Sequence, residues 1–414
     1  MTMAKGARTG LRALAGLLAL VLAPAADAGP GNGIRLGGSA ARLHPYLELE
    51  GRYDSNLVFT EEGEQEAGFI LHVRPGLTLA SPSERAAVDF RAHLDWAQYL
   101  GESSDLSRLF GDAALSVGLN RRGSLGLELT DVFRRSSSTR NLTLGYAVVS
   151  NTNDLRVSVP FRPGGGAFVT TLTGGWRLET FEPFVKGNLC EGGAPECDAD
   201  QAAQLDYSDV TGGLDLRWKF LPKTAAVLQG EYWRRLPSDP DAGLELSGYR
   251  GWAGVAGLFS AHLAGTLRGG YGSASLSPGS ISTWLANAEV EWIPLETASV
   301  KAGYLHDLGA DPGAAGAYTS HRGYADARAL LAARYTVQLV ASYERRAYQG
   351  VRVVEAADLL TVTPSVDVEL ARWLTAGAGV SYSRRTSELA AGTRPLPGYA
   401  YSKTEAFLRV RGTY

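Results

Sequence analysis

Ionisable side chains recur at every second position in several stretches of this sequence, and that spacing limits the chemistry they could perform. The clearest stretch, 85–100, alternates Val88, Phe90, Ala92, Leu94 and Trp96 with Asp89, Arg91, His93 and Asp95. Residues two apart share one face of a β-strand, whereas a helix would scatter them around its axis. We therefore interpret the ionisable groups as the lining of a water-filled space, in preference to a proton-transfer site around His93.

The same separation of charged from apolar positions appears in three later stretches. Their predicted lining residues are Asp209, Asp215, Arg217 and Lys219, then Asn287, Glu289 and Glu291, and finally Lys403, Glu405, Arg409 and Arg411. A lumen filled with water requires charged groups on one face of each strand and apolar groups on the other. A soluble β-sandwich would alternate as well and stays an alternative.

Sequence motifs of enzymes and cofactor sites are not found. The histidines are scattered over positions 44, 72, 93, 262, 306 and 321, without H-E-x-x-H, and neither G-x-S-x-G nor a P-loop occurs. We predict no catalytic residue, no metal and no cofactor, although a hydrolase triad assembled from distant segments stays an alternative. The net charge of −3 does not favour a nucleic-acid partner.

The chain carries two cysteines, Cys190 and Cys197, in a stretch rich in Gly and Pro. They are too close together and too few for a structural zinc site. In an oxidising compartment such a pair predicts a local disulfide, with two free thiols as the alternative.

The N-terminus has the order of a secretory signal peptide. Lys5, Arg8 and Arg12 precede or enter an apolar run, and Ala26 and Ala28 form an A-x-A cleavage signature. The apolar run, 13–24, is shorter than the about 20 residues of a membrane-spanning helix. We expect a signal peptide at 1–28 that is cleaved near Ala28, a periplasmic N-terminal segment at 29–41 and one β-structured domain at 42–414.

Eighteen segments with period-2 alternation fill that domain. The first is 42–56 and the last is 400–414, and the segments between them include 106–120 and 203–221. Tight connections alternate with long ones, and 50 glycines suit a protein with many turns. This pattern predicts an all-β, transmembrane, antiparallel up-and-down barrel of the outer membrane, closed by pairing of its first and last strands. Pro364 lacks a ladder donor, so we expect a bulge there.

The expected barrel places four arginine doublets at its outer rim, each close to an aromatic residue. They are Arg134–Arg135, Arg234–Arg235, Arg345–Arg346 and Arg384–Arg385. We expect the members Arg135, Arg235, Arg346 and Arg385 to point inward and attract anions, and their neighbours to meet lipopolysaccharide phosphates. The alternative is that all eight simply anchor the barrel among outer-membrane lipids.

The opening strand resembles a known family. Its P-x-L…G-x-Y-D-S-N pattern comprises Pro45, Leu47, Gly51, Tyr53, Asp54, Ser55 and Asn56, and PGLTL follows at 75–79. These residues resemble the putative β-barrel porin 2 family, which carries no catalytic residues over to this chain. The final Tyr414, preceded by Val410 and Leu408, is similar to the signal that the outer-membrane assembly machinery reads.

The resemblance implies a role, because some members of this family are the outer-membrane component of exopolysaccharide export. In that role the barrel would serve as the pore for a periplasmic polysaccharide-export protein. A barrel of 18 strands leaves an aqueous channel unless a loop, here 182–202 or 388–399, folds into it. The alternatives are a general or anion-leaning diffusion porin and a plugged surface receptor or structural barrel.

Overall fold

The computed structural model describes residues 31–36, 40–138, 148–183, 202–239, 245–276, 279–311, 316–349, 354–390 and 400–414. The predicted signal peptide, Cys190, Cys197 and most of both candidate plug loops lie outside the described residues. Within the described ranges, no helix has the length and apolar character needed to cross a membrane.

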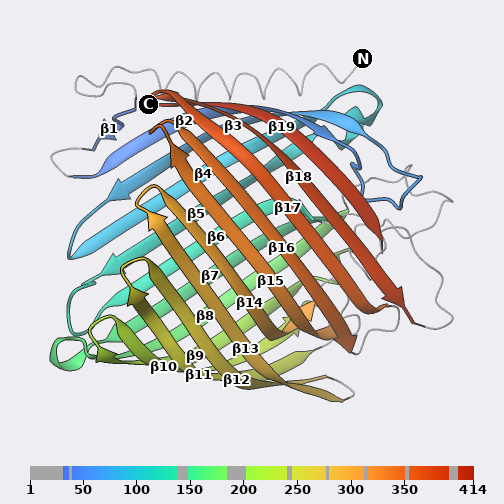
Figure 1. The fold of residues 1–414 in the computed structure, drawn as a ribbon. Helices are drawn as coiled ribbons and strands as arrows, with labels where there is room; N and C mark the ends of the chain where they lie inside the picture. Colours follow the sequence, from blue (N-terminus) through green and yellow to red (C-terminus); the bar gives the residue numbers. More distant parts are fainter. Residues whose placement is uncertain are drawn as a thin grey trace.

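The chain folds into one antiparallel sheet of β-strands (Figure 1). The strands are β1 (Ile34–Arg35), β2 (Arg42–Asp54), β3 (Gly68–Ser81), β4 (Ala86–Tyr99), β5 (Arg108–Leu119), β6 (Leu127–Ser138), β7 (Val148–Phe161), β8 (Phe168–Pro183), β9 (Tyr207–Leu221), β10 (Thr224–Pro237), β11 (Leu246–Ser260), β12 (Leu263–Ser275), β13 (Ser280–Leu295), β14 (Ala298–Asp311), β15 (Gly316–Leu331), β16 (Tyr335–Gln349), β17 (Val354–Ala371), β18 (Leu374–Leu389) and β19 (Tyr401–Thr413). Short 3₁₀ turns lie at Gly101–Leu106 (η1) and Pro163–Gly165 (η2).

Strands β2 to β19 form a closed barrel of 18 strands, as predicted. The last strand pairs with the first, from Glu405 opposite Asp54 to Thr413 opposite Tyr46. The backbone N–H of Tyr414 extends this ladder by donating to Pro45 O over 2.9 Å. Figure 1 shows β19 lying beside β2, although these strands stand at opposite ends of the sequence. The short strand β1 adds to the start of β2.

The two ends of the barrel differ in their connections. Short turns join β3 to β4, β13 to β14 and the other hairpins at one end, here called the turn end, where β19 also finishes. Long connections follow β2, β8 and β18 at the opposite end, here called the loop end. This alternation of connection lengths is the one that the sequence predicts.

Three local expectations need correction. The strand expected at 203–221 begins at Tyr207, because the preceding residues form a helical turn closed by Asp206 N–H donating to Ala203 O. The 3₁₀ turn η1 occupies the start of the strand expected at 106–120. Pro364 causes no bulge: the β17–β18 register is the same on both sides of it, and the ladder merely skips two positions.

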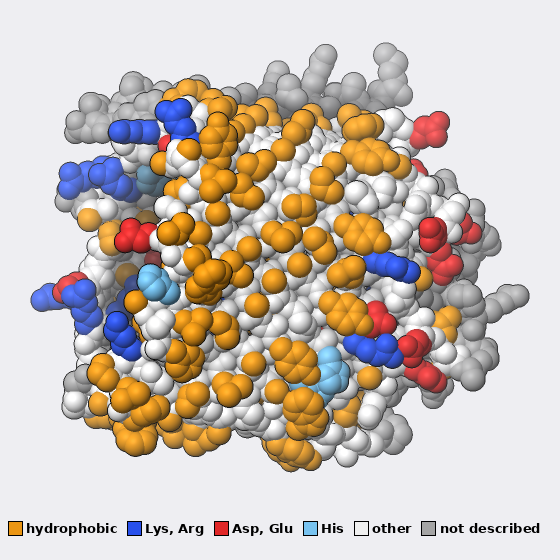
Figure 2. Space-filling model, in the orientation of Figure 1, with side chains coloured by type: hydrophobic (Ala, Val, Ile, Leu, Met, Phe, Trp, Pro, Cys, Tyr) orange, Lys and Arg blue, Asp and Glu red, His pale blue; other side chains and the backbone are white. Residues whose placement is uncertain are grey.

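The outer surface of the barrel is apolar. Exposed hydrophobic side chains include Leu408 (70% exposed), Leu267 (61%) and Phe69 (60%). Figure 2 shows hydrophobic side chains spread over the viewed face, while charged side chains gather towards the two ends of the barrel, at left and right. The alternate positions of the same strands carry buried charges, such as Glu50 on β2 and Lys403 on β19. An apolar outer face with charges behind it is the arrangement of a barrel in a membrane.

Candidate functional site: the charged network at the barrel closure

The densest group of charges lies where the barrel closes, on β2, β3, β4 and β19. We call it the closure network; its members are Glu48, Glu50, Arg52, Asp54, His72, Arg74, Asp95, Lys403, Glu405 and Arg411. Strand alternation places these side chains on one face, opposite exposed apolar neighbours such as Leu49 and Trp96.

Arg74 is the centre of the network. One of its terminal nitrogens lies 2.8 Å from both Glu48 Oε1 and Glu50 Oε2, and its Nε lies 3.0 Å from Asp95 Oδ2. Asp95 also accepts from His72 Nδ1 at 2.9 Å. Glu48 and Glu50 are only 3% and 2% exposed, so these carboxylates need nearby cations, and Arg74 is the cation that they share.

Three ion pairs cross directly between the last strand and the first. Lys403 Nζ lies 2.7 Å from Asp54 Oδ2 at the loop end, and Arg411 lies 2.8 Å from Glu48 Oε2 towards the turn end. Between them, Arg52 Nη1 lies 3.1 Å from Glu405 Oε1. These pairs fix the register of the closure, because a slip of one residue would turn every charge towards lipid.

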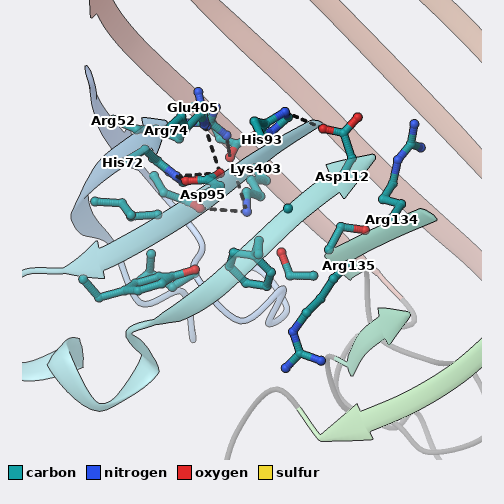
Figure 3. Close-up of a pocket in the computed structure, with 18 of the residues that line it drawn as sticks. Arg52, His72, Arg74, His93, Asp95, Asp112, Arg134, Arg135, Lys403 and Glu405 are labelled. Atoms are coloured by element: carbon teal, nitrogen blue, oxygen red, sulfur yellow. Dashed lines mark hydrogen bonds and ion pairs between the residues drawn. The ribbon is translucent and has the colours of Figure 1, made fainter. Parts of the chain in front are cut away.

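A cavity of about 370 Å³ opens beside the network towards β5 and β6 (Figure 3). His93 of β4 contacts its register partner Asp112 of β5 in the lining of this cavity. Figure 3 shows Arg134 and Arg135 extending in opposite directions. Within the described residues, Arg134 has no ion-pair partner and His72 Nε2 has no hydrogen-bond partner. The cavity therefore offers one uncompensated cation, beside a wall whose charges are paired.

The other predicted lining residues are also mostly paired. The ion pairs join Asp209 to Arg235 (2.8 Å), Asp215 to Arg217 (2.8 Å), Glu289 to Lys301 (3.3 Å) and Arg409 to Asp367 (2.7 Å). Asp89, Arg91 and Lys219 are exposed, whereas Asn287 and Glu291 are half-buried. The structure brings Asp95, His93, Lys403, Glu405 and Arg411 together around the closure, and it leaves the others on separate parts of the wall.

The arginine doublets divide by burial. Arg235 and Arg385 are 8% and 5% exposed. Arg346 is half-buried, with its guanidinium 4.8 Å from the centre of the Tyr318 ring. Their neighbours, Arg234, Arg345 and Arg384, are exposed.

In the first doublet, strand alternation makes Arg134 the inward member in place of the expected Arg135. Arg134 stands opposite Asp112, whereas Arg135 shares its alternation face with Phe133, which is 41% exposed. Arg135 donates to Leu109 O over 3.1 Å, at the point where the β5–β6 ladder ends. Both arginines line the cavity because β6 departs from the ladder with β5 there.

The predicted lining residues do not include the centre of the network. Glu48, Glu50 and Arg52 alternate with apolar residues as clearly as the predicted lining residues do, so this pattern is sufficient to identify them. His72 and Arg74 carry a weaker signal, because Pro75 and Gly76 interrupt the alternation of their strand.

No catalytic arrangement is apparent among these residues. Each buried carboxylate of the closure network faces a cation, and the network contains no hydroxyl or thiol nucleophile. Its geometry suits a rigid, hydrated wall. A closed antiparallel barrel with an apolar outer surface and such a wall is an outer-membrane β-barrel.

The comparison with protein families agrees with this class. The family model described as "Putative beta-barrel porin 2" matches residues 29–412, and the chain belongs to that family. The resemblance seen in the opening strand is thus confirmed. No curated protein matches the chain.

Solved structures also match the chain at low identity. The apoprotein form of the FrpB iron transporter from Neisseria meningitidis (F5-1 variant) is 8% identical with a TM-score of 0.46, over 90% of this chain and 81% of that chain. The outer membrane protein OpdK from Pseudomonas aeruginosa is 10% identical with a TM-score of 0.46, over 90% and 99%. OccK3 (OpdO) from the same organism is 13% identical with a TM-score of 0.41, over 90% and 95%.

Proposed function

We propose that this protein is the outer-membrane pore through which a hydrophilic polymer, an exopolysaccharide, leaves the cell. The observation that carries the proposal is the paired wall: acids and bases cover one face of the strands at the closure, yet they neutralise one another. Such a wall holds water but presents little net charge, so a polymer can slide past it without being trapped. Conduction requires binding that is weak enough to allow exit.

Family membership and barrel size support the same role. An 18-stranded barrel is wide enough to leave an aqueous channel. Exopolysaccharide export is the role that the family resemblance suggests. In that role a periplasmic polysaccharide-export protein would deliver the polymer at the turn end, which we assign to the periplasmic side of the membrane.

The remaining contacts of the proposed pore are with its surroundings. The exposed arginines at the loop end, Arg234, Arg345 and Arg384, would meet lipopolysaccharide phosphates, which guanidinium groups bind in a bidentate manner. Tyr414 would mark the chain for the assembly machinery after removal of the signal peptide near Ala28. The predicted lining residues would face the transported polymer.

A deletion strain tests the role. Loss of the gene should abolish display of the surface polymer while the uptake of small hydrophilic solutes changes little. Re-expression of the full chain should restore the polymer. The opposite result, with normal surface polymer and reduced solute uptake, would replace export by a diffusion porin.

A further inference from the structure

The ladder between β13 and β14 stops well before the two strands end. Their register runs from Leu295 opposite Ala298, near the turn, to Ala286 opposite His306. Beyond that point β13 continues to pair with β12, and β14 with β15 as far as Asp311. Within the described residues, the loop-end parts of β13 and β14 are therefore not paired with each other. We call this break the β13–β14 seam.

The strand ends overlap at the seam. Leu308 shares its alternation face with Tyr304, which is 38% exposed on the outer surface, but Leu308 itself is completely buried. It packs in one cluster with Ile281 and Leu285, which alternate with the exposed Trp284 and thus lie on the interior face. An outward side chain of β14 thus contacts inward side chains of β13. The loop end of β14 must lie on the interior side of β13.

Apolar side chains fill the space between the overlapping layers. The cluster consists of Trp233, Leu246, Trp252, Ala274, Ile281, Leu285, Leu308 and Ala317. Ala317 belongs to β15, which pairs with β14. Like Leu308, Ala317 occupies an outward position in the alternation of its strand. The overlap thus forms an apolar layer that runs from the outer surface of the wall towards its interior.

A few polar side chains replace the missing ladder. His306 Nδ1 donates to Ser320 O over 2.9 Å, and its Nε2 lies 3.0 Å from Thr283 Oγ1 on the other side of the seam. Because a carbonyl oxygen only accepts, Nδ1 carries the proton, and Nε2 of the neutral ring accepts from the Thr283 hydroxyl. Trp284 stacks on the His306 ring with the centroids 4.0 Å apart.

Arg250 holds the interior side of the seam. Its Nη1 lies 3.2 Å from Asp307 Oδ2 and 3.4 Å from Leu308 O, a backbone carbonyl on the unpaired end of β14. Its other terminal nitrogen lies 2.9 Å from Glu231. The seam is thus closed by side chains, which can rearrange without breaking a ladder.

This construction makes opening easier here than in a continuous wall. Parting two fully paired strands in lipid would expose a row of unsatisfied backbone groups. Parting β13 from β14 at the loop end breaks a few side-chain contacts and uncovers apolar surface. An alkyl chain can cover that surface, since it restores the contacts that Leu285 and Leu308 lose.

We propose that the β13–β14 seam is a lateral portal, closed in this structure, that admits the alkyl chain of an amphipathic membrane molecule between the overlapping strand ends. The occupant follows from the location: Trp284 and Tyr304 expose their rings on the membrane side at 54% and 38%, where lipid is the surrounding phase. The proposal goes beyond passage of a polymer along the barrel axis and does not depend on it.

Site-specific photolabelling tests the portal. The full chain would carry the diazirine analogue of leucine at Leu308 and would be reconstituted in phosphatidylcholine vesicles, irradiated and analysed by mass spectrometry for lipid adducts. The matched negative control is the same analogue at Val227, a buried interior position in a continuous ladder. Leu408, which is 70% exposed, is the positive control.

We expect about tenfold more lipid adduct at Leu308 than at Val227, because transient opening admits acyl chains at the seam and not in the continuous ladder around Val227. Locking the seam should remove this signal. For that purpose Thr283→Cys and His306→Cys would be joined by a short bifunctional thiol reagent. A pair at Ala288→Cys and Tyr304→Cys, register partners in the continuous part of the same ladder, is the control that should leave labelling unchanged.

Labelling of Leu308 at the level of Val227 would overturn the proposal, and so would equal labelling before and after the seam is locked. The locked protein should retain its ion conductance in planar bilayers. That readout shows that the barrel is intact, and it separates failure of the portal from failure of the pore.

Discussion

The closure between β19 and β2 and the seam between β13 and β14 join the barrel wall in opposite ways. The closure has a continuous ladder, and ion pairs such as Lys403–Asp54 and Arg411–Glu48 reinforce it. The seam loses its ladder at Ala286–His306 and is held by side chains alone. The wall thus carries cross-strand ion pairs along its whole ladder in one region and loses its ladder in the other.

The difference follows from the separation of the strands in sequence. Strands β2 and β19 lie at opposite ends of the barrel domain, so only non-covalent contacts hold them in register, and the entropy of closing that long loop opposes pairing. Strands β13 and β14 are joined by a short turn, which holds them together at the turn end. Their loop ends can separate while the turn keeps the two strands in register, so a portal can form there.

The largest expected effect comes from the centre of the closure network. Arg74→Met removes the cation shared by Glu48, Glu50 and Asp95. Each of these buried carboxylates then keeps a single partner, which is Arg411, Arg52 and His72 respectively. We expect a loss of about 3–5 kcal/mol in the free energy of unfolding. Urea unfolding, followed by the mobility shift of the folded barrel on gels, measures it.

The matched control for this change is Arg217→Met. Arg217 is also paired, with Asp215, but its side chain is 60% exposed. The control substitution should lower the free energy of unfolding by about 0–1 kcal/mol. If both variants lost the same stability, the closure network would have no special role in the wall.

A second prediction concerns coupling across the closure. Asp54→Ala and Lys403→Ala each leave a buried charge without its partner at 2.7 Å, whereas the double variant removes both charges. The double variant should therefore be more stable than the sum of the single losses implies, by about 0.5–3 kcal/mol. The same unfolding assay, applied to the unchanged protein, both single variants and the double variant, gives this coupling free energy. Additive losses would contradict a direct interaction between the two strands.

A substitution at the seam should lower the free energy of unfolding by less than one in the closure network. Thr283→Val removes the hydroxyl that bonds His306 Nε2, and the expected loss is about 0.5–1.5 kcal/mol. The control, Thr361→Val, lies in the continuous ladder between β16 and β17 and should change stability by no more than this. The two variants should differ in proteolysis of the native barrel in detergent, which should increase near the seam for Thr283→Val alone. Equal cleavage patterns would argue that the seam is as rigid as the rest of the wall.

The smallest expected effect is on ion selectivity beside the closure. Arg134 is the uncompensated cation of the cavity there, so Arg134→Ser should lower the ratio of anion to cation permeability by about twofold at low salt. Reversal potentials in planar bilayers measure this ratio. Arg234→Ser is the control, because Arg234 is paired with Glu245. A shift of the same size in the control would remove any special role from Arg134.

The sequence was sufficient for the architecture, because alternation is a local property of each strand. The polar and apolar positions of 400–414 and 42–56 predict that the last strand pairs with the first, and the structure contains this pairing. The pairs that the charged residues form around the closure could not be predicted from the sequence alone. The contact between Arg74 of β3 and Asp95 of β4 depends on the register between the strands, which a single sequence does not specify.

The seam could not be predicted, because Leu285 and Leu308 resemble any other apolar residues in alternating strands. Their contact depends on a displacement of whole strand ends, which is a tertiary effect. The error at Pro364 has a different cause. The missing N–H was recognised correctly, but the sheet tolerates it by leaving two positions unpaired with β18, without inserting an extra residue.

Conductance of the purified full chain in planar lipid bilayers tests the central claim most directly. We expect discrete conductance steps on insertion of the barrel, and brief partial blockades when dextran oligomers are added, because an open hydrated pore admits a neutral polymer. Insertion without any conductance above that of the bare bilayer would contradict the pore and would favour a plugged receptor or a structural barrel.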